Sequence, residues 1–520
     1  MDLGLGRVLA LLQRLGSPHT RIPVIHVAGT NGKGSAVACL DALLTHAVGV
    51  RSARFVSPHL VCARDSVRVT GGEPVDEGTW ELARKRVREA DQPTAGAGAD
   101  AAPIGATPFE LLTAQALLAF TLLPAATRPN VLVVEVGVGG RLDATNVFPA
   151  DQVLASVICP IARDHESLLG RGLAAIAREK AGIVKEHGLC VIADQSTPAC
   201  IPGAPTPPDP AVLSTLQQVC DAQRAYVSHT TVPWQRMALQ PESGRGPPRA
   251  QAAFTMPLTG AGGAQVPVEV DATLARISGT ATALQTLWSI AHHGAAATAE
   301  VQALRTRIRE RLFSPQGPCT SRIRAALAHA RCEGRSEWHT WPSSRRPLDV
   351  LLDGAHNEAS AHALRAYLET CCSVRAARSA ARPLKVQVRW VIAFSQGRAV
   401  RPMLDALLLP GGVQPRGWEC AEQTVCFVPF STPVEGMPWV RPVAPEELAA
   451  AARGGAKALD AAHVQVADSL TQALRSIEAG PEKCDDTPLA VTVVCGSLYL
   501  VSDFYRALET RVDHAGATGS

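Results

Sequence analysis

The sequence lacks the features that mark nucleic-acid-binding, membrane-spanning and disulfide-rich proteins. Its 520 residues include 50 basic and 47 acidic side chains, so no charge excess indicates a nucleic acid or a membrane surface as partner. No apolar run reaches the length of a membrane-spanning helix. The 14 cysteines form neither a C-x-x-C pair nor a zinc-type cluster, which indicates reduced thiols, with the pair Cys371-Cys372 packed in a helix. These absences favour small-molecule chemistry in the cytoplasm.

The length and the pattern of apolar residues predict two α/β domains. A chain of this size exceeds what one core usually organises. Strands and helices alternate, so both sheets should be mostly parallel, the first in residues 1–297 and the second in residues 298–520. Strands are predicted at 22–29, 51–57, 130–137, 151–158, 348–354, 385–394, 424–430 and 489–496, and helices at 1–16, 33–47, 107–123 and 278–297. The Pro-, Gly- and Ala-rich stretches 92–108, 201–211 and 241–248 are predicted surface insertions.

The segment "GTNGKGS" between the first predicted strand and helix is typical of a phosphate-binding loop. Its glycines allow backbone N–H groups to converge on phosphate oxygens at a helix N-terminus. Lys33 would reach the outer phosphates, and Ser35 could bind Mg²⁺. The alternative is a glycine-rich turn that only starts a helix, but the strand before it and the helix after it favour a nucleotide site.

Several later residues are candidates for the same site, and each has a structural alternative. Glu135 ends a very apolar strand and is well placed to hold Mg²⁺, or else it pairs with Arg141. Asp164-His165 follows another strand and could supply a further metal or phosphate contact, although a lone histidine is more often a structural residue. An ordinary solvated lysine is the default for Lys180. Asp353 and His356 follow a strand of the second domain, where ligands of open α/β sheets bind, but Asp, Gly and Asn there could also only stabilise a turn.

Taken together, these segments resemble the folylpolyglutamate synthase and dihydrofolate synthase family, relatives of the Mur ligases. The resemblance runs in order through nearly the whole chain: "HVAGTNGKGS", "SPHL", "PFELLTAQAL", "VEVGVGGRLDATNV", "DHESLLG", "EKAGIVK", "DGAHN" and "VVCGSLYL". Gly34 is part of the family's own loop, which reads G-K-G-S. Within the family, "DSVRV", "DHESLLG", "VEGMPWVRPVAPEEL" and "VVCGSLYLV" look like the fungal-type dihydrofolate synthases.

The resemblance implies a fold, a reaction and a set of site residues. The fold is a Mur-ligase-like P-loop ATPase domain followed by a smaller Rossmann-like domain that binds glutamate and closes the cleft. ATP would phosphorylate a pteroate or folate carboxylate, and the amino group of L-glutamate would displace phosphate. The implied ATP-binding residues are Thr30, Asn31, Gly32, Lys33, Gly34, Ser35, Arg335, Asp353 and His356. The implied metal ligands are Ser35, Glu135 and His165, the catalytic residues are Lys33, His165 and a carbamylated Lys180, and the acceptor-binding residues are Ser57, Pro58, His59, Asp143 and Asn146.

The chain departs from the family pattern at two places. Arg335 matches the arginine of the family's Trp-Pro-Gly-Arg sequence, whose first two residues are Cys332 and Glu333 here. The family's His-Gln-x-x-Asn element, whose Asn binds the adenine, is absent. Ser278 or Gln285 could bind the adenine in its place. Asp143 and Asn146 could also belong only to a local turn.

The leading functional hypothesis is a dihydrofolate synthase that joins L-glutamate to 7,8-dihydropteroate with ATP and Mg²⁺. The alternatives are a folylpolyglutamate synthase acting on tetrahydrofolate, a bifunctional enzyme, or a non-catalytic nucleotide-binding protein. The protein is expected to be a cytoplasmic monomer, with a mitochondrial pool as an option, and to bind neither nucleic acid nor membranes.

Overall fold

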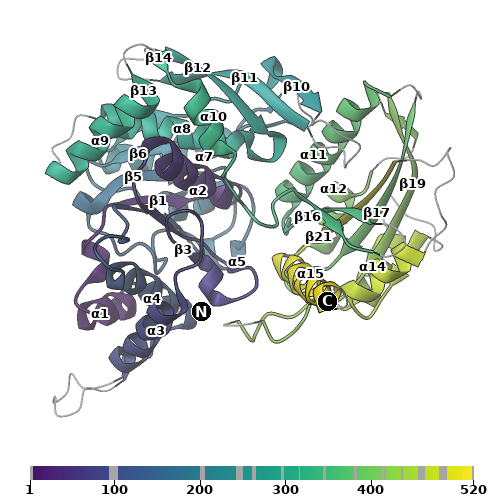
Figure 1. The fold of residues 1–520 in the computed structure, drawn as a ribbon, viewed down its shortest axis with the longest axis horizontal. Coiled ribbons are helices and arrows are strands. Elements are labelled where there is room, and N and C mark those ends of the chain that lie inside the picture. The colour runs from purple at the N-terminus through teal and green to yellow at the C-terminus, as the bar shows by residue number, and fades with distance from the viewer. Residues whose placement is uncertain are drawn as a thin grey trace.

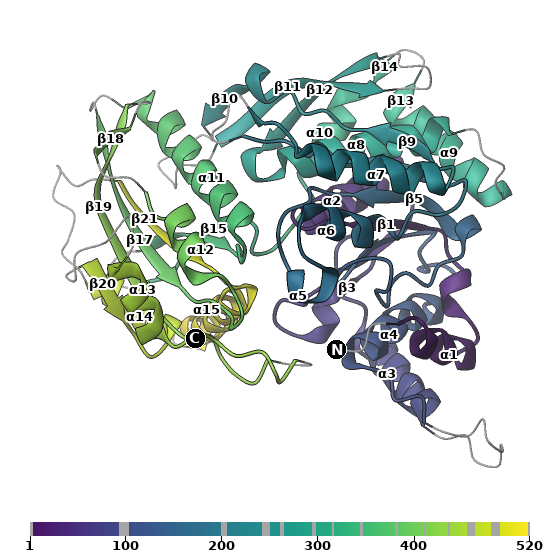
Figure 2. The ribbon, with the colours of Figure 1, turned by 180° about the vertical axis from the view of Figure 1, so that it is seen from behind.

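The computed structural model describes most of the chain in two units that lie side by side (Figures 1 and 2). It covers residues 4–517 except 93–102, 199–204, 242–249, 260–264, 294–297, 315–316, 344–346, 380–382, 410–411, 415–416, 435–436, 455–462 and 480–488. Most of the stretch 92–108, part of 201–211 and nearly all of 241–248 therefore lie outside the described residues. No helix in the described part is both long and apolar enough to cross a membrane.

A seven-stranded sheet forms the centre of the first unit. Its strand order is β3 (Val67–Arg68), β2 (Ser52–Phe55), β4 (Val131–Glu135), β1 (Val24–Ala28), β5 (Val153–Ile158), β6 (Leu189–Ile192) and β9 (Tyr226–His229). All neighbours are parallel except β3, which runs antiparallel to β2. Strands β1, β4 and β5 are buried along their whole length, as expected for parallel strands covered on both faces.

Helices cover both faces of this sheet because alternate strand residues point to opposite sides. Val131 and Val133 pack with α2 (Lys33–Ala42), its π-helical continuation Leu43–Val48 and α8 (Ile277–His292). Leu132 and Val134 pack with α1 (Gly6–Arg14), α3 (Glu77–Asp91) and α4 (Pro108–Leu122). The edge toward β6 is covered by α6 (Leu173–Ala181) and α7 (Pro210–Ala222), and the short α5 (Glu166–Leu169) precedes α6.

The first unit also contains smaller elements that the apolar pattern did not predict. An antiparallel sheet consists of β10 (Ala238–Pro241), β11 (Ala250–Thr259) and β12 (Gln265–Thr273), and short pairs are formed by β7 (Thr197–Pro198) with β8 (Pro205–Thr206) and β13 (Phe313–Ser314) with β14 (Gly317–Pro318). Helices α9 (Ala299–Leu312) and α10 (Thr320–Leu327) pack against α8, α2 and the π-helical turn. The division predicted after residue 297 precedes both helices, so we place it between Leu327 and Glu337, where the chain crosses to the second sheet.

The second unit is built on another mostly parallel sheet. Its strand order is β15 (Glu337–Trp341), β16 (Leu348–Asp353), β21 (Leu489–Cys495), β17 (Leu384–Ile392), β19 (Trp418–Phe427) and β18 (Gly412–Gln414), with β20 (Val464–Val466) beside β19. Helices α11 (Glu358–Ala376), α12 (Val400–Leu407) and α13 (Pro445–Arg453) cover one face, and α14 (Leu470–Ala479) and α15 (Leu498–Ala517) cover the other. Cys371 and Cys372 are buried in α11, as predicted. The predicted α/β fold class with two mostly parallel sheets is confirmed.

Candidate active site

The phosphate-loop candidate lies at the carboxyl end of β1, between that strand and α2. The backbone N–H groups of Thr30 and Asn31 donate to the carbonyl of Pro160, at 3.0 and 3.2 Å. The Thr30 hydroxyl exchanges hydrogen bonds of 3.1 Å with the backbone of Ala162. Gly32 has a φ of +83° and caps α2 without a side chain. The loop is therefore anchored on the segment after β5, and the N-terminus of α2 is left for an anion.

Gly34, the residue that distinguishes this loop from an ordinary phosphate loop, lies where three segments of the chain meet. A Cβ at this position would lie 3.4 Å from the Sγ of Cys332 and 3.7 Å from Oε2 of Glu135. The first turn of α2 thus contacts both the end of β4 and the chain segment that leads into the second unit. These are ordinary van der Waals distances, so the meeting of the three segments does not by itself require glycine.

Lys33 and Glu135 come together beside the first turn of α2, which also contains Ser35. The Nζ of Lys33 lies 3.6 Å from Oε1 of Glu135 and 3.4 Å from the carbonyl of Thr30. Burial raises the pKa of Glu135, and the charge of Lys33 opposes that rise. Arg141 pairs with Glu179 at 2.9 Å, so the alternative pairing of Glu135 with Arg141 is wrong.

The hydroxyl of Ser35 is a buried polar group that lacks a partner. Within the described part of the chain, its Oγ has no hydrogen-bond partner. Such groups are rare in native proteins and call for an explanation such as a missing ion. No group of three or more His, Cys, Asp and Glu among the described residues could hold a metal by itself. A cation here would therefore depend on Ser35, Glu135 and oxygen atoms of a bound phosphate.

Asp164 connects the two units beside this loop. Its carboxylate accepts from Nδ2 of Asn357 at 3.2 Å, lies 3.4 Å from Nε2 of His356 and pairs with Arg398. Burial alone would raise the pKa of Asp164, but the hydrogen bond from His356 and nearby positive charges hold it far below the usual range. Asn357 also bonds to Asn31 of the phosphate loop at 3.1 Å. Asn357 thus links the second unit both to the loop and to the buried carboxylate of Asp164.

Near Asp164, Lys180 is buried and the side chain of His165 is partly exposed. Burial lowers the pKa of His165 to about 4, so its imidazole is neutral at pH 7 and able to bind a metal. Lys180 is only 4% exposed, and burial together with the charge of Lys33 lowers its pKa to about 7. The default of an ordinary solvated lysine is therefore wrong.

The site residues predicted in the second unit lie just before β15 and at the carboxyl end of β16. Asp353, at the end of β16, accepts from the backbone N–H groups of Ser336 and Ala355 at 2.7 and 2.8 Å. Its carboxylate thus stabilises the turn, which was the competing interpretation. The positive charge of Arg335 opposes the effect of burial on the pKa of both Asp353 and Glu135. The Nη1 of Arg335 donates to the carbonyl of Gly354 at 3.4 Å, next to Asp353.

The predicted acceptor-binding residues fall into two groups. Ser57, Pro58 and His59 follow β2; His59 is buried, and the buried Oγ of Ser57 has no partner among the described residues. Asp143 accepts from the backbone of Val138 and from Thr145, and Asn146 bonds to the carbonyls of Arg141 and Gly182. The bonds of Asp143 are those of a local turn, whereas Asn146 also joins this turn to the segment after α6. Contact of these two side chains with an acceptor stays a prediction.

The two candidates for adenine recognition differ in position. Gln285 is fully buried, and its Nε2 donates to the hydroxyls of Ser228 at 2.8 Å and Ser289 at 3.1 Å. Gln285 therefore belongs to the core. Ser278 lies in the first turn of α8, next to Gly279, which packs directly on Ser35. Only Ser278 is close to the loop.

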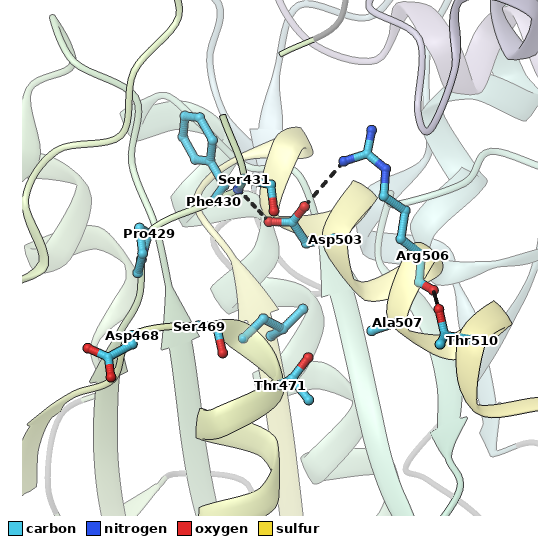
Figure 3. A pocket seen from close by; sticks show the side chains of 11 residues that line it. Pro429, Phe430, Ser431, Asp468, Ser469, Thr471, Asp503, Arg506, Ala507 and Thr510 are labelled. Atoms are coloured by element: carbon cyan, nitrogen blue, oxygen red, sulfur yellow. Dashed lines mark hydrogen bonds and ion pairs between the residues drawn. The ribbon is translucent and has the colours of Figure 1, made fainter. Parts of the chain in front are cut away.

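Two clefts lie near the junction of the units. The larger, about 750 Å³, is lined by both units and contains the arginines Arg64, Arg68, Arg276, Arg331 and Arg335. The smaller, about 340 Å³, is formed by the second unit alone beside α15 (Figure 3). The predicted acceptor segment Ser57–His59 continues directly into Leu60 and Val61, which line the larger cleft.

The sequence-based choice of site residues missed three contacts that join the first unit to the second or to the segment between them. Arg398 follows β17 at the carboxyl edge of the second sheet, a position that could have drawn attention to it. Arg54 donates to the carbonyl of Arg331 at 3.0 Å, and Arg68 pairs with Glu333 at 3.4 Å. A charged residue inside a short strand was the only signal for Arg54.

Comparison with known proteins reveals similarity along the whole chain. A family model described as "Dihydrofolate synthetase, C-terminal domain" matches residues 337–507. The chain is 28% identical to the "Probable dihydrofolate synthetase" of Schizosaccharomyces pombe, covering 98% of this chain and 100% of that protein. It is 27% identical to the "Dihydrofolate synthetase" of Saccharomyces cerevisiae, covering 97% and 98%. A solved structure of Mycobacterium tuberculosis folylpolyglutamate synthase, complexed with ADP and AMPPCP, matches with a TM-score of 0.66 at 25% identity over 97% of this chain and 95% of that chain.

Proposed function

The chain belongs to the family of dihydrofolate synthases and folylpolyglutamate synthases, and from this premise we propose that it is an ATP-dependent ligase that joins L-glutamate to 7,8-dihydropteroate. The observation that carries the choice of acceptor is the end-to-end similarity to two dihydrofolate synthetases, together with the match of the second unit to the C-terminal domain of such enzymes. The second candidate is a folylpolyglutamate synthase or a bifunctional enzyme, and it is supported by the fold that this chain shares with the mycobacterial enzyme.

The proposed reaction activates a carboxylate before the amide bond forms. A carboxylate is a poor electrophile, because its charge repels nucleophiles and it has no good leaving group. Transfer of the γ-phosphoryl group of ATP to a carboxylate oxygen yields an acyl phosphate and ADP. The neutral amino group of glutamate then attacks the acyl carbon, phosphate leaves with the oxygen it received, and the amine loses a proton. Catalysis consists mostly of positioning and of stabilising phosphate charge.

The phosphate loop supplies the residues for the nucleotide. The first turn of α2 and the Gly32–Ser35 backbone fit a phosphate group, and Lys33 lies beside them. Arg335 and the Asp164-bound Arg398 bring positive charge from the second unit to the same edge. Closure of the units thereby surrounds the transferred phosphoryl group with cations, which stabilises its charge in the transition state.

The residues around Ser35 fit a magnesium ion. Ser35 has an unpartnered buried hydroxyl and Glu135 is a buried carboxylate, and hard oxygen donors with phosphate oxygens are the ligands that Mg²⁺ prefers. His165, neutral at pH 7, is the third proposed ligand. When bound, the ion supplies charge neutralisation of the phosphates. Lys33, which pairs with Glu135 in this structure, would then donate to phosphate instead.

Lys180 fits the proposed carbamylation. Carbon dioxide reacts with a neutral amine, and a pKa near 7 leaves a large share of Lys180 neutral at physiological pH. Addition of carbon dioxide forms an N–C bond and releases a proton, converting a buried cation into a carboxylate. The positive charge of Lys33 acts on Lys180 and would stabilise that anion.

The arginine-lined cleft is the proposed site for the amino acid substrate. Glutamate carries two carboxylates, and guanidinium groups recognise carboxylates through paired hydrogen bonds. The cleft contains arginines of both units, so glutamate binding and closure of the units would support each other. The protein is proposed to act as a monomer in the cytoplasm.

The experiment that tests this function compares two acceptors. Purified protein is incubated with ATP, Mg²⁺ and labelled L-glutamate, together with either dihydropteroate or tetrahydrofolate. We expect labelled product with dihydropteroate and none in the Lys33→Ala variant. Activity only with an acceptor that already carries glutamate would replace dihydrofolate synthase by the second candidate. Undiminished product formation by Lys33→Ala would remove the proposed mechanism.

A further inference from the structure

Helix α15 separates the two clefts and faces the first unit in both views (Figures 1 and 2). Tyr505 and Glu509 line the large arginine-rich cleft. Asp503, Arg506 and Thr510 line the small one (Figure 3). A change in the position of this helix would therefore change the shape of the large cleft.

Arg506 connects α15 to the segment that follows β2 in the first unit. Its Nη2 donates to the carbonyl oxygen of Val61 at 2.9 Å, and its Nη1 lies 3.4 Å from Oδ1 of Asp503. The other carboxylate oxygen of Asp503 accepts from the backbone N–H of Ser431 at 2.7 Å, so the aspartate is fixed from two sides (Figure 3). One guanidinium thus joins a braced carboxylate of the second unit to a backbone carbonyl of the first.

The segment held by Arg506, residues 57–66, is a loop that ends in a 3-10 turn at Ala63–Ser66 and has its own internal bonds. The N–H groups of Val61 and Cys62 donate to Oδ2 of Asp65 at 3.0 and 2.9 Å. These bonds fix the curvature of the loop but not its position relative to α15. Leu60 adds an apolar contact, because it packs against the core cluster between the second sheet and α15, which Leu498 and Tyr499 also join.

We propose that Arg506 is a positioning residue for the acceptor: by binding Val61 it holds the loop of residues 57–66 against the second unit in the conformation that binds the acceptor. The inference rests on the proposed function, in which the acceptor lies beside Ser57, Pro58 and His59. These residues directly precede Leu60 and Val61, which line the large cleft. Closure of the second unit therefore completes the acceptor site, whereas the nucleotide loop is held by a different contact, from Asn357 to Asn31.

The test measures the loop and the kinetics separately in Arg506→Ala and Arg506→Lys. Arg506 is half-exposed, so losing one charge-assisted hydrogen bond should raise the KM for dihydropteroate about three- to tenfold and leave the KM for ATP unchanged. Lysine keeps one donor and should restore part of the loss. Amide hydrogen exchange should rise in peptides covering residues 57–66 and stay unchanged in the phosphate loop. Arg475→Ala, at an exposed arginine of α14, is the matched control.

Each outcome decides the proposal. Unchanged exchange in residues 57–66 together with an unchanged acceptor KM in Arg506→Ala would overturn it. An equal rise in the KM for ATP and for the acceptor would also overturn it, because it would indicate general misplacement of the unit. If the wild-type protein uses an acceptor other than dihydropteroate, the proposed function fails, while hydrogen exchange still tests the contact and the KM is measured with the acceptor that is used.

Discussion

The contact between Gly279 and Ser35 leads to a prediction whose size follows from the coordinates. Replacing Gly279 by alanine places a Cβ 2.3 Å from the Oγ of Ser35 and 2.9 Å from both its Cβ and its carbonyl carbon. Rotation of the Ser35 side chain relieves the first contact but not the other two, so α8 must move away from α2. Overpacking of this kind costs about 1–3 kcal/mol. With roughly 2–4 °C per kcal/mol in a domain of this size, the melting temperature should fall by about 2–12 °C.

The same displacement should weaken nucleotide binding, because Ser35 is part of the phosphate loop. The assays are thermal unfolding and titration with ATP and Mg²⁺. Gly6→Ala is the matched control: Gly6 is also helical, and an added Cβ there would meet nothing within 4 Å. Helix propensity predicts that this control is as stable as the wild type or up to about 1 kcal/mol more stable. A Gly279→Ala variant that unfolds and binds ATP like the wild type would refute the packing argument.

Three further predictions concern buried charged groups. Lys180→Ala should abolish activity and remove an adduct with the mass of one carbon dioxide from the native mass spectrum. Since the pKa of Lys180 is about 7, both the adduct and the activity of the wild type should decline as the pH falls below 7. An adduct that persists in the variant would contradict this prediction. Arg54→Ala removes the guanidinium that lies 3.8 Å from the buried carboxylate of Asp41, so the free energy of unfolding in urea should fall by about 3–5 kcal/mol. The control is Arg84→Ala at an exposed ion pair, where the free energy of unfolding should fall by about 0.5 kcal/mol or less. Asp164→Asn removes the charge that holds Arg398 and His356, so kcat should fall at least about tenfold while ATP still binds; an unchanged kcat would show that this link is not needed for catalysis.

Local patterns predicted those parts of the fold that local physics determines. Buried parallel strands are apolar along their length, so "VIHVA" and "VLVVE" indicated β1 and β4 directly. Their carboxyl ends meet at one edge of the sheet, so the proximity of Lys33 and Glu135 followed from the strand pattern. The antiparallel sheet β10–β12 and the packing of α9 and α10 on the first unit did not follow, because they depend on contacts between distant segments.

The candidate site was predictable in its types of residue but not in its long-range partners. Asp164 could be noticed after a strand, yet its partners His356, Asn357 and Arg398 lie about two hundred positions along the chain. The burial of Lys180 was likewise not predictable, since Lys180 ends a run of three charged residues, which is typical of a solvent-exposed helix end. For Asp143 the local interpretation was available, and its hydrogen bonds to Val138 and Thr145 correspond to it.

The central claim is that this chain activates the carboxylate of dihydropteroate as an acyl phosphate, and oxygen transfer tests it most directly. Dihydropteroate labelled with heavy oxygen in its carboxylate is converted with ATP and unlabelled L-glutamate, and the phosphate released is analysed by mass spectrometry. We expect one labelled oxygen per amide formed to appear in inorganic phosphate, with ADP as the nucleotide product, and neither product with Lys33→Ala. Label in AMP, or phosphate without label while the amide forms, would contradict the account.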